Sequence, residues 1–153
     1  MSVVMPEPDR AVLDRRAEIV AALSEIVPGE GVIASEHAMR PYESDGLTAY
    51  RQLPMVVVLP ETTDQVSAVL RYCHDNGIKV VPRGAGTSLS GGALPLIDGV
   101  LLGMGKFNRI REIDYANRVV VAEPGVTNLA ISAAVQDQAF YYAPDPSSQI
   151  ACT

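Results

Sequence analysis

A strand, a helix and a second strand follow one another between residues 55 and 81. MVVVL at Met55–Leu59 predicts a buried strand. Thr62 and Gln65 form a capping box, and apolar residues then recur at helical spacing as far as Asn76-Gly77, which predicts a helix. IKVV at 78–81 predicts the next strand. Because such a connection is right-handed and joins parallel strands, the pattern predicts a βαβ unit whose two strands pair in parallel.

A glycine-rich stretch, VVPRGAGTSLSGG at 80–92, begins where the second strand ends. Glycine lets backbone N–H groups approach a ligand and allows successive amides to converge on one anion. Thr87, Ser88 and Ser90 add hydroxyl donors, and Arg83 adds a forked, positively charged donor set suited to phosphate. Open α/β sheets bind ligands at the carboxyl ends of their strands. The stretch therefore predicts a loop that binds phosphate or pyrophosphate.

Neither of the two common nucleotide-binding loops matches this stretch. A GxGxxG fingerprint needs a third glycine where Leu89 stands, and a Walker A loop needs a lysine where Gly92 follows Gly91. An ordinary glycine-rich surface turn is the alternative interpretation. Arg83 also has an alternative role, as the structural partner of a buried carboxylate.

Composition limits the partners of the chain. Its 153 residues are 48% hydrophobic and 20% charged, which is typical of a soluble globular domain. The net charge of −6 argues against nucleic acid or an anionic membrane as partner, because both need a basic face. No run approaches the roughly eighteen apolar residues of a membrane helix. The first ten residues lack the basic leader and apolar core of a secretory signal.

The cysteines and histidines predict neither a disulfide nor a metal site. Cys73 and Cys152 stand far apart and form no CxxC motif, which favours reduced thiols and a cytoplasmic protein. Cys73 is expected to face the core from its helix. His37 and His74 have no second histidine or cysteine nearby, so no metal site is predicted.

The remaining segments suggest further elements on both sides of the βαβ unit. Helical spacing predicts a helix from Asp9, its N-cap, to Val27, and the weakly periodic residues 29–54 predict an ordered crossing segment. GVLLGM at 99–104 predicts a third strand.

A hairpin and another helix are predicted beyond residue 108. RIREID and VVVA indicate an antiparallel hairpin with Asn117 in its turn, and Thr127 can cap a helix that runs to about Gln138. A second loop, APDPSSQIACT, closes the chain. The helix has a face of small residues suited to close packing, formed by Leu129, Ala130, Ala133 and Ala134. Three tyrosines are expected in the core, Tyr115, Tyr141 and Tyr142.

These motifs occur in the order and at the spacing of a known family. The matching segments are YESDGLTAY, MVVVLPETTDQVSAVLRYC, PRGAGTSLSGGALP, VVVAEPGV and PDPSSQIACT, which together cover about residues 42–153. The sequence resembles the flavin-binding domain of the vanillyl-alcohol-oxidase type, known as PCMH-type, in the branch of the FAD-linked subunit of glycolate oxidase and D-lactate dehydrogenase.

The resemblance implies an α+β fold in which FAD is held between two subdomains. A small parallel βαβ subdomain would be followed by a truncated second α+β subdomain. Residues 1–50 would form an N-terminal helix and crossing segment, and residues 51–153 the first part of the FAD-binding domain. The implied cofactor-binding residues are Pro82, Arg83, Gly84, Ala85, Gly86, Thr87, Ser88 and Leu89 from the first loop, Gly125, and Pro144, Asp145, Ser148 and Thr153 from the second loop.

Two departures from the family's pattern carry expectations of their own. Members with covalent flavin have a histidine where Thr87 stands here, so the resemblance implies non-covalent FAD. The family's chain continues far past Thr153 into a cap that supplies the substrate pocket and the catalytic base. Catalytic residues are therefore expected beyond residue 153, and the sequence is interpreted as an inactive fragment of a longer enzyme.

The implied function is the FAD-dependent oxidation of a small 2-hydroxy acid such as glycolate or D-lactate. The electrons would pass to an acceptor or to a partner electron-transfer subunit. The alternatives are a non-catalytic α/β module that binds a phosphate ligand or partner chain, and a flavin oxidase of another alcohol. Gly86→Val is expected to abolish FAD binding at little cost to the fold.

Overall fold

A four-stranded sheet organises the first lobe of the protein. The computed structural model describes residues 5–153, and the strand order is β1 (Val32–Ile33), β2 (Val56–Val58), β4 (Gly99–Gly103) and β3 (Lys79–Arg83). The last three strands are mutually parallel, whereas β1 runs antiparallel to β2. All five residues of β4 are buried, as expected for a central strand that is covered on both faces.

The βαβ prediction is confirmed in part. Helix α4 (Thr63–Asp75) starts at the predicted capping box of Thr62 and Gln65, and β2 and β3 are parallel. Direct pairing of β2 with β3 is wrong, because β4 lies between them and pairs with both. Periodicity identifies a strand but does not state its neighbours. With β4 between β2 and β3, the carboxyl ends of three parallel strands lie at one edge of the sheet.

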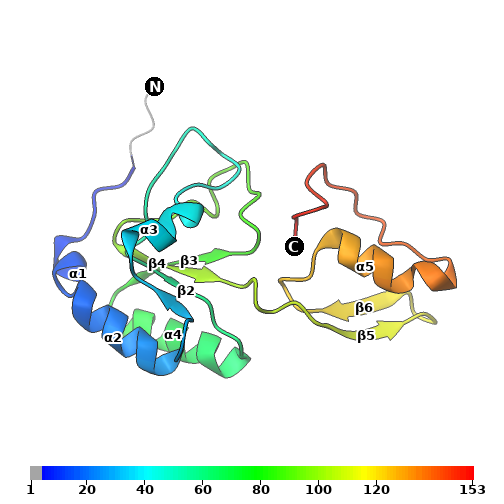
Figure 1. The fold of residues 1–153 in the computed structure, drawn as a ribbon, viewed down its shortest axis with the longest axis horizontal. Helices are drawn as coiled ribbons and strands as arrows, with labels where there is room; N and C mark the ends of the chain where they lie inside the picture. The colour runs from blue at the N-terminus through cyan, green and yellow to red at the C-terminus, as the bar shows by residue number, and fades with distance from the viewer. Residues whose placement is uncertain (1–4) are drawn as a thin grey trace.

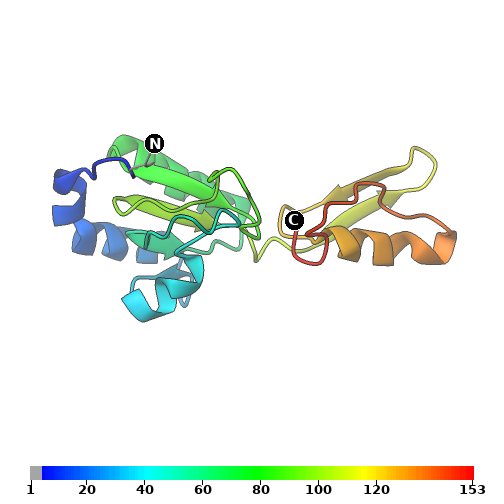
Figure 2. The ribbon, with the colours of Figure 1, turned by 90° about the horizontal axis from the view of Figure 1, so that it is seen from above.

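Helices cover both faces of this sheet (Figures 1 and 2). Helices α1 (Arg10–Asp14), α2 (Arg16–Ile26) and α4 lie on one face, and the short α3 (Glu36–Met39) and η1 (Arg40–Tyr42) lie on the other. The alternation of the β2 valines divides the core accordingly. The larger cluster includes Ile19, Leu23, Val56, Val58, Val69 and Cys73, and the smaller one is Met39, Val57 and Leu101.

The N-terminal predictions need one correction. Asp9 caps the first helix as predicted, by accepting from the Ala11 N–H, but the single helix is broken at Arg15. The Arg15 side chain donates to the Asn76 carbonyl at 3.0 Å, which ties the break to the end of α4. Residues 32–42, predicted only as a crossing segment, supply β1, α3 and η1 to the first lobe. Residues 1–4 of the predicted N-terminal segment lie outside the described residues, and a domain boundary at residue 50 stays a prediction.

The second lobe contains a hairpin and one helix. Strands β5 (Ile110–Asp114) and β6 (Val119–Ala122) are antiparallel, and α5 (Asn128–Val135), capped by Thr127, continues into η2 (Gln136–Gln138). These predictions are confirmed.

Predictions about packing in the second lobe are wrong. The small residues Ala130, Ala133 and Ala134 are exposed, and α5 instead buries Ile131 and Val135. Tyr115, Tyr141 and Tyr142 are exposed by 36% or more, because a two-stranded sheet and one helix cannot enclose them.

A buried carboxylate fixes the start of the second lobe. The Glu123 side chain is 3% exposed and accepts hydrogen bonds from the Arg109 backbone and from the Arg109 and Arg111 guanidinium groups. These donors lower the pKa of Glu123 to about 2, and the largest contribution comes from the side chain of Arg109. Next to it, the Gly125 N–H donates to the Phe107 carbonyl at 2.6 Å. Hydrogen bonds therefore join residues 107–111 to residues 123–125 at the start of the second lobe.

Glu123→Gln is expected to lower the unfolding midpoint at pH 7. Because the folded pKa of about 2 lies below the ordinary value of 4.5, the stability from ionised Glu123 is complete above pH 4.5 and is lost as the pH falls toward 2. Thermal unfolding of wild type and variant between pH 7 and pH 3 should therefore show a midpoint difference that shrinks with acid. Glu112→Gln, at an exposed position of the same hairpin, is the control. A midpoint difference that is the same at both ends of this range would contradict the prediction.

Candidate functional site

The glycine-rich loop leaves β3 at the edge where the parallel strands end. Gly84 and Ala85 are exposed, and Gly86, Thr87 and Ser88 are half-buried. Gly86 has a φ of +74° and Gly91 a φ of +77°, a backbone region that favours glycine. The predicted position of the loop, at the carboxyl end of a parallel strand, is confirmed.

Several backbone N–H groups in the first half of the loop have no hydrogen-bond partner within residues 5–153. The amides of Gly84, Gly86 and Thr87 donate to no acceptor among residues 5–153, and the Ala85 N–H donates to the Thr153 hydroxyl at 3.2 Å. The Ser88 hydroxyl accepts from the Gly92 N–H at 3.3 Å, which leaves its proton free to be donated. Neighbouring unpaired amides with adjacent hydroxyls can form a concave site for an anion.

The Arg83 side chain turns back beneath the loop. The residue is 9% exposed, and its Nη1 donates to the Ser44 carbonyl at 2.8 Å and to the Ala93 carbonyl at 3.4 Å. A Cβ on Gly86 would overlap the guanidinium group. This placement favours the alternative role of Arg83 as a structural partner, although its partners are carbonyls. Because Gly86 also has a φ of +74°, Gly86→Val is expected to disturb the loop backbone as well as FAD binding, which is more than the small cost expected from the sequence.

Sequence reasoning missed the segment on which the loop rests. The Asp45 carboxylate, 6% exposed, accepts from the Leu47 N–H at 2.9 Å and from the Ala93 N–H at 3.3 Å. A Cβ on Gly46 would lie 2.8 Å from the carbonyl oxygens of both Thr87 and Ser88. The sequence signal for this segment is Ser-Asp-Gly at 44–46, which favours a turn but was interpreted only as part of the family resemblance.

The second loop approaches the first through its last residue (Figure 1). Asn128 holds this loop, because its N–H donates to the Cys152 carbonyl and its side chain donates to the Pro144 carbonyl. A Cβ on Gly84 would lie 2.5 Å from the Thr153 hydroxyl oxygen, so the two loops are in contact. The structure thus brings Thr153 to the first loop, whereas the cofactor contacts of Asp145 and Ser148 stay predictions.

Three other predicted residues have different surroundings. Pro82 lies exposed within β3, paired with Leu102 of β4. Leu89, implied by the resemblance as a cofactor-binding residue, is 76% exposed. A Cβ on Gly125 would lie 2.6 Å from the Phe107 carbonyl oxygen, so close packing of the link between the lobes already accounts for this glycine.

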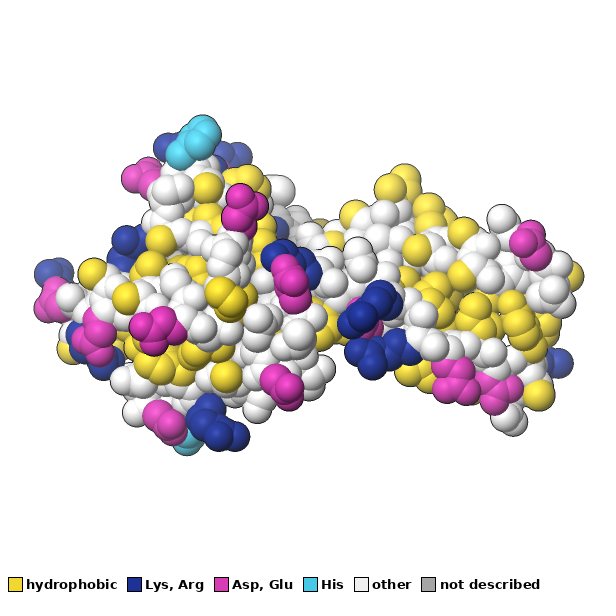
Figure 3. All heavy atoms as spheres, turned by 60° about the horizontal axis from the view of Figure 1, so that its bottom comes forward, with side chains coloured by type: hydrophobic (Ala, Val, Ile, Leu, Met, Phe, Trp, Pro, Cys, Tyr) yellow, Lys and Arg dark blue, Asp and Glu magenta, His cyan; other side chains and the backbone are white. Residues whose placement is uncertain are grey.

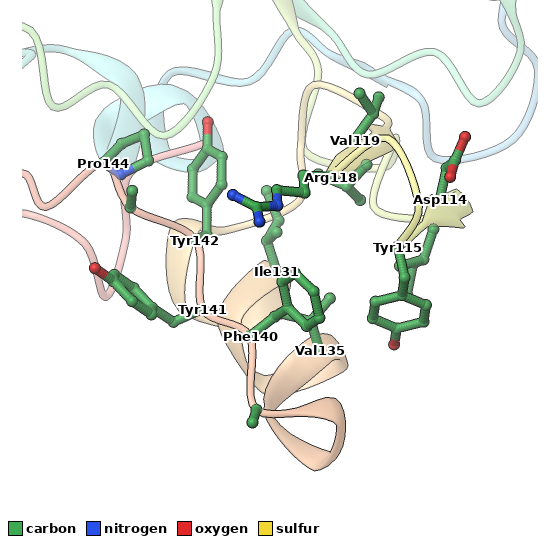
Figure 4. Close-up of a pocket in the computed structure, with 14 residues that line it drawn as sticks. Asp114, Tyr115, Arg118, Val119, Ile131, Val135, Phe140, Tyr141, Tyr142 and Pro144 are labelled. Carbon is green, nitrogen blue, oxygen red and sulfur yellow. The ribbon is translucent and has the colours of Figure 1, made fainter.

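Of two hollows on the surface of residues 5–153, the smaller adjoins the loop. A hollow of about 250 Å³ at the carboxyl edge is lined by residues that include Arg83, Gly84 and Lys106. The other, of about 480 Å³, lies in the second lobe among exposed apolar side chains (Figure 3). Figure 4 shows the Arg118 side chain directed toward Tyr142. On the other side of the hollow, the centres of the Phe140 and Tyr115 rings are 5.4 Å apart. The larger hollow contains none of the loop amides, so the candidate site is the smaller one and the loop.

Residues 5–153 contain no group of three or more histidine, cysteine or acidic side chains placed to hold a metal ion. None of the helices described is both long and apolar enough to cross a bilayer.

The loop fits the pyrophosphate of FAD. Its unpaired amides, its hydroxyls and the absence of a Cβ at Gly84 and Gly86, where none would fit, suit a group with several acceptor oxygens. A nearby cation, Lys106, pairs with Glu61 at 2.6 Å, which lowers the pKa of Glu61. The protein therefore offers the anion mainly backbone dipoles.

Comparison with known proteins gives relatives in sequence and in structure. The chain is 53% identical to the glycolate oxidase subunit GlcD of Escherichia coli K12 over 138 residues, 90% of this chain and 28% of that protein. It is 31% identical to the mitochondrial D-2-hydroxyglutarate dehydrogenase of Bos taurus over 87% of this chain and 24% of that protein. An alkyldihydroxyacetonephosphate synthase structure, 17% identical, covers all of this chain with a TM-score of 0.78 and 29% of its own length. The chain thus spans about 28% of the GlcD sequence.

A family model confirms the predicted fold and cofactor. The model for the FAD binding domain matches residues 54–153. The resemblance to the glycolate oxidase branch, the mixed α+β fold with a parallel sheet, and FAD as cofactor are all confirmed. The chain therefore belongs to the FAD binding domain family.

Proposed function

We propose that the full-length protein is an FAD-dependent dehydrogenase that oxidises a small 2-hydroxy acid such as glycolate, and that this chain holds the FAD pyrophosphate. The observation that carries the proposal is the loop of unpaired amides, in a chain 53% identical to a glycolate oxidase subunit. The relative from Bos taurus is named for another 2-hydroxy acid, which supports this substrate class.

In this proposal the chain binds and orients the cofactor. The amides of Gly84, Gly86 and Thr87 and the hydroxyls of Thr87 and Ser88 would donate to the pyrophosphate. Asp145, Ser148 and Thr153 would lie along it from the second lobe. The bound flavin would accept two electrons from the substrate, while the protein supplies position and electrostatics.

The cofactor is proposed to be dissociable. Threonine at position 87 has no ring nitrogen with which to form a histidyl–flavin bond. The loop contacts would then be hydrogen bonds only, so the flavin would be released when the protein is denatured.

Electron transfer is proposed to involve an acceptor or another subunit. The E. coli relative is itself named a subunit of glycolate oxidase, which supports a partner chain. The cytoplasmic location expected from the cysteines stays a prediction.

The full-length protein is expected to be yellow and to reduce an artificial electron acceptor when glycolate is added. Acceptor reduction measured with glycolate, D-lactate and L-lactate would establish the substrate class. Ethanol serves as the control, because it lacks the carboxylate of a 2-hydroxy acid. A colourless protein that takes up no added FAD would contradict the proposal.

Acid precipitation of the full-length protein is expected to leave its flavin in the supernatant. The visible absorbance of the supernatant and of the redissolved pellet measures how the flavin divides between them. The reason is the lack of a covalent anchor at Thr87. Flavin retained by the washed pellet would show that another residue forms such a bond.

Gly46→Ala is expected to weaken FAD binding by about tenfold or more, because the loop must shift to relieve two contacts of 2.8 Å with its carbonyl oxygens. Titration of the FAD-stripped full-length protein measures the dissociation constant. Thr48→Ala, an exposed substitution in the same segment, should leave this constant unchanged. Equal affinity of Gly46→Ala and wild type would show that the loop conformation does not control binding.

A further inference from the structure

Both ends of the glycine-rich loop are attached to the same segment, residues 42–47. At the first end, Arg83 Nη1 donates to the Ser44 carbonyl at 2.8 Å and to the Tyr42 carbonyl at 3.5 Å. The guanidinium carbon also lies 5.8 Å from the centre of the Tyr42 ring. The side chain that begins the loop is therefore directed inward, away from the exposed amides.

At the far end of the loop, Ala93 is held on both of its backbone polar groups. Its carbonyl accepts from Arg83 Nη1 at 3.4 Å, and its N–H donates to Asp45 Oδ2 at 3.3 Å. Asp45 also accepts from the Leu47 N–H, so its two oxygens join segment 42–47 to the end of the loop. Arg83 and Asp45 thus close a bridge beneath the loop, from residue 83 to residue 93.

The middle of the loop lies directly on this bridge. The Arg83 guanidinium occupies the space that a Cβ of Gly86 would need, and Gly46 lies against the Thr87 and Ser88 carbonyls. In a trans peptide the N–H lies opposite the carbonyl, so the N–H groups of Ser88 and Leu89, which follow these carbonyls, are directed away from the segment. The contacts below the loop thus set the direction of its central amides.

We propose that Arg83 and Asp45 are positioning residues that hold the loop with its amides directed at the FAD pyrophosphate, and that neither side chain touches the phosphates. The inference rests on the proposed binding of FAD by this loop and specifies which residues fix the loop conformation. Both residues are at most 9% exposed, and each already has backbone partners. Burial lowers the pKa of Arg83, and the Asp45 carboxylate opposes that change.

Asp45→Asn distinguishes positioning from simple electrostatics by the sign of its effect. Removing a negative charge near the phosphates should tighten FAD binding if the charge acts only through space. An asparagine can keep the bond from the Leu47 N–H, but its amide then presents a donor to the Ala93 N–H, so the bridge opens. Positioning therefore predicts weaker binding. If the competent loop is populated about a tenth of the time, the dissociation constant rises about tenfold.

The experiment uses the full-length protein stripped of flavin, with FAD as the probe. The dissociation constant is measured by titration, and hydrogen exchange of residues 84–93 is measured without FAD. Asp45→Asn should bind FAD about tenfold more weakly and exchange faster in this loop. The control is Asp75→Asn, which makes the same charge change at an exposed position of α4 and should match wild type in both measurements.

Arg83→Lys is the second variant. It tests the positioning role by itself if Asp45→Asn does not fold. Lysine keeps the charge but lacks the planar fork that reaches several carbonyls at once, so positioning predicts the same weaker binding and faster exchange. Wild-type affinity in Arg83→Lys, or tighter binding in Asp45→Asn, would overturn the inference. Failure of the wild-type protein itself to bind FAD would instead overturn the proposed function.

Discussion

Two buried side chains of opposite charge, Arg83 and Asp45, lie between the sheet and the glycine-rich loop. A buried charge is costly unless hydrogen bonds replace its lost hydration. Here backbone groups do so, because Arg83 donates to carbonyls and Asp45 accepts from N–H groups. Within residues 5–153, every buried side-chain nitrogen or oxygen has a hydrogen-bond partner. The loop conformation is therefore the one that satisfies both charges.

The strand order explains why this arrangement can exist at all. With β4 between β2 and β3, the carboxyl ends of all three strands open on one edge, and Arg83 is the last residue of β3. Segment 42–47 reaches the same edge, because η1 ends at Tyr42 after α3 has crossed the opposite face from α2 and α4. Loop and support thus come from parts of the chain about forty residues apart, brought together by the sheet.

The sequence predicts the local features of this architecture better than its contacts. Capping by Asp9, Thr62 and Thr127 depends on residues within one turn, and all three caps are confirmed. The position of β4 between its neighbours depends on long-range pairing, which periodicity does not encode. The inward direction of Arg83 depends on carbonyls of segment 42–47, so the charge suggested a phosphate contact while the structure places it beneath the loop. The exposed tyrosines were missed because apolar character predicts burial only where enough chain is present to cover it.

One hydrogen bond joins the second lobe directly to the glycine-rich loop. The Thr153 hydroxyl oxygen accepts from the Ala85 N–H at 3.2 Å, between amides of Gly84 and Gly86 that have no described acceptor. An oxygen from the second lobe therefore already reaches the row of donors that the first lobe presents. The Glu123 hydrogen bonds and the contact of Gly125 with Phe107 order the chain where the second lobe begins. Closer to the loop, the carbonyl of Cys152, the neighbour of Thr153, accepts from the Asn128 N–H, so α5 holds the end of the second loop that reaches Ala85.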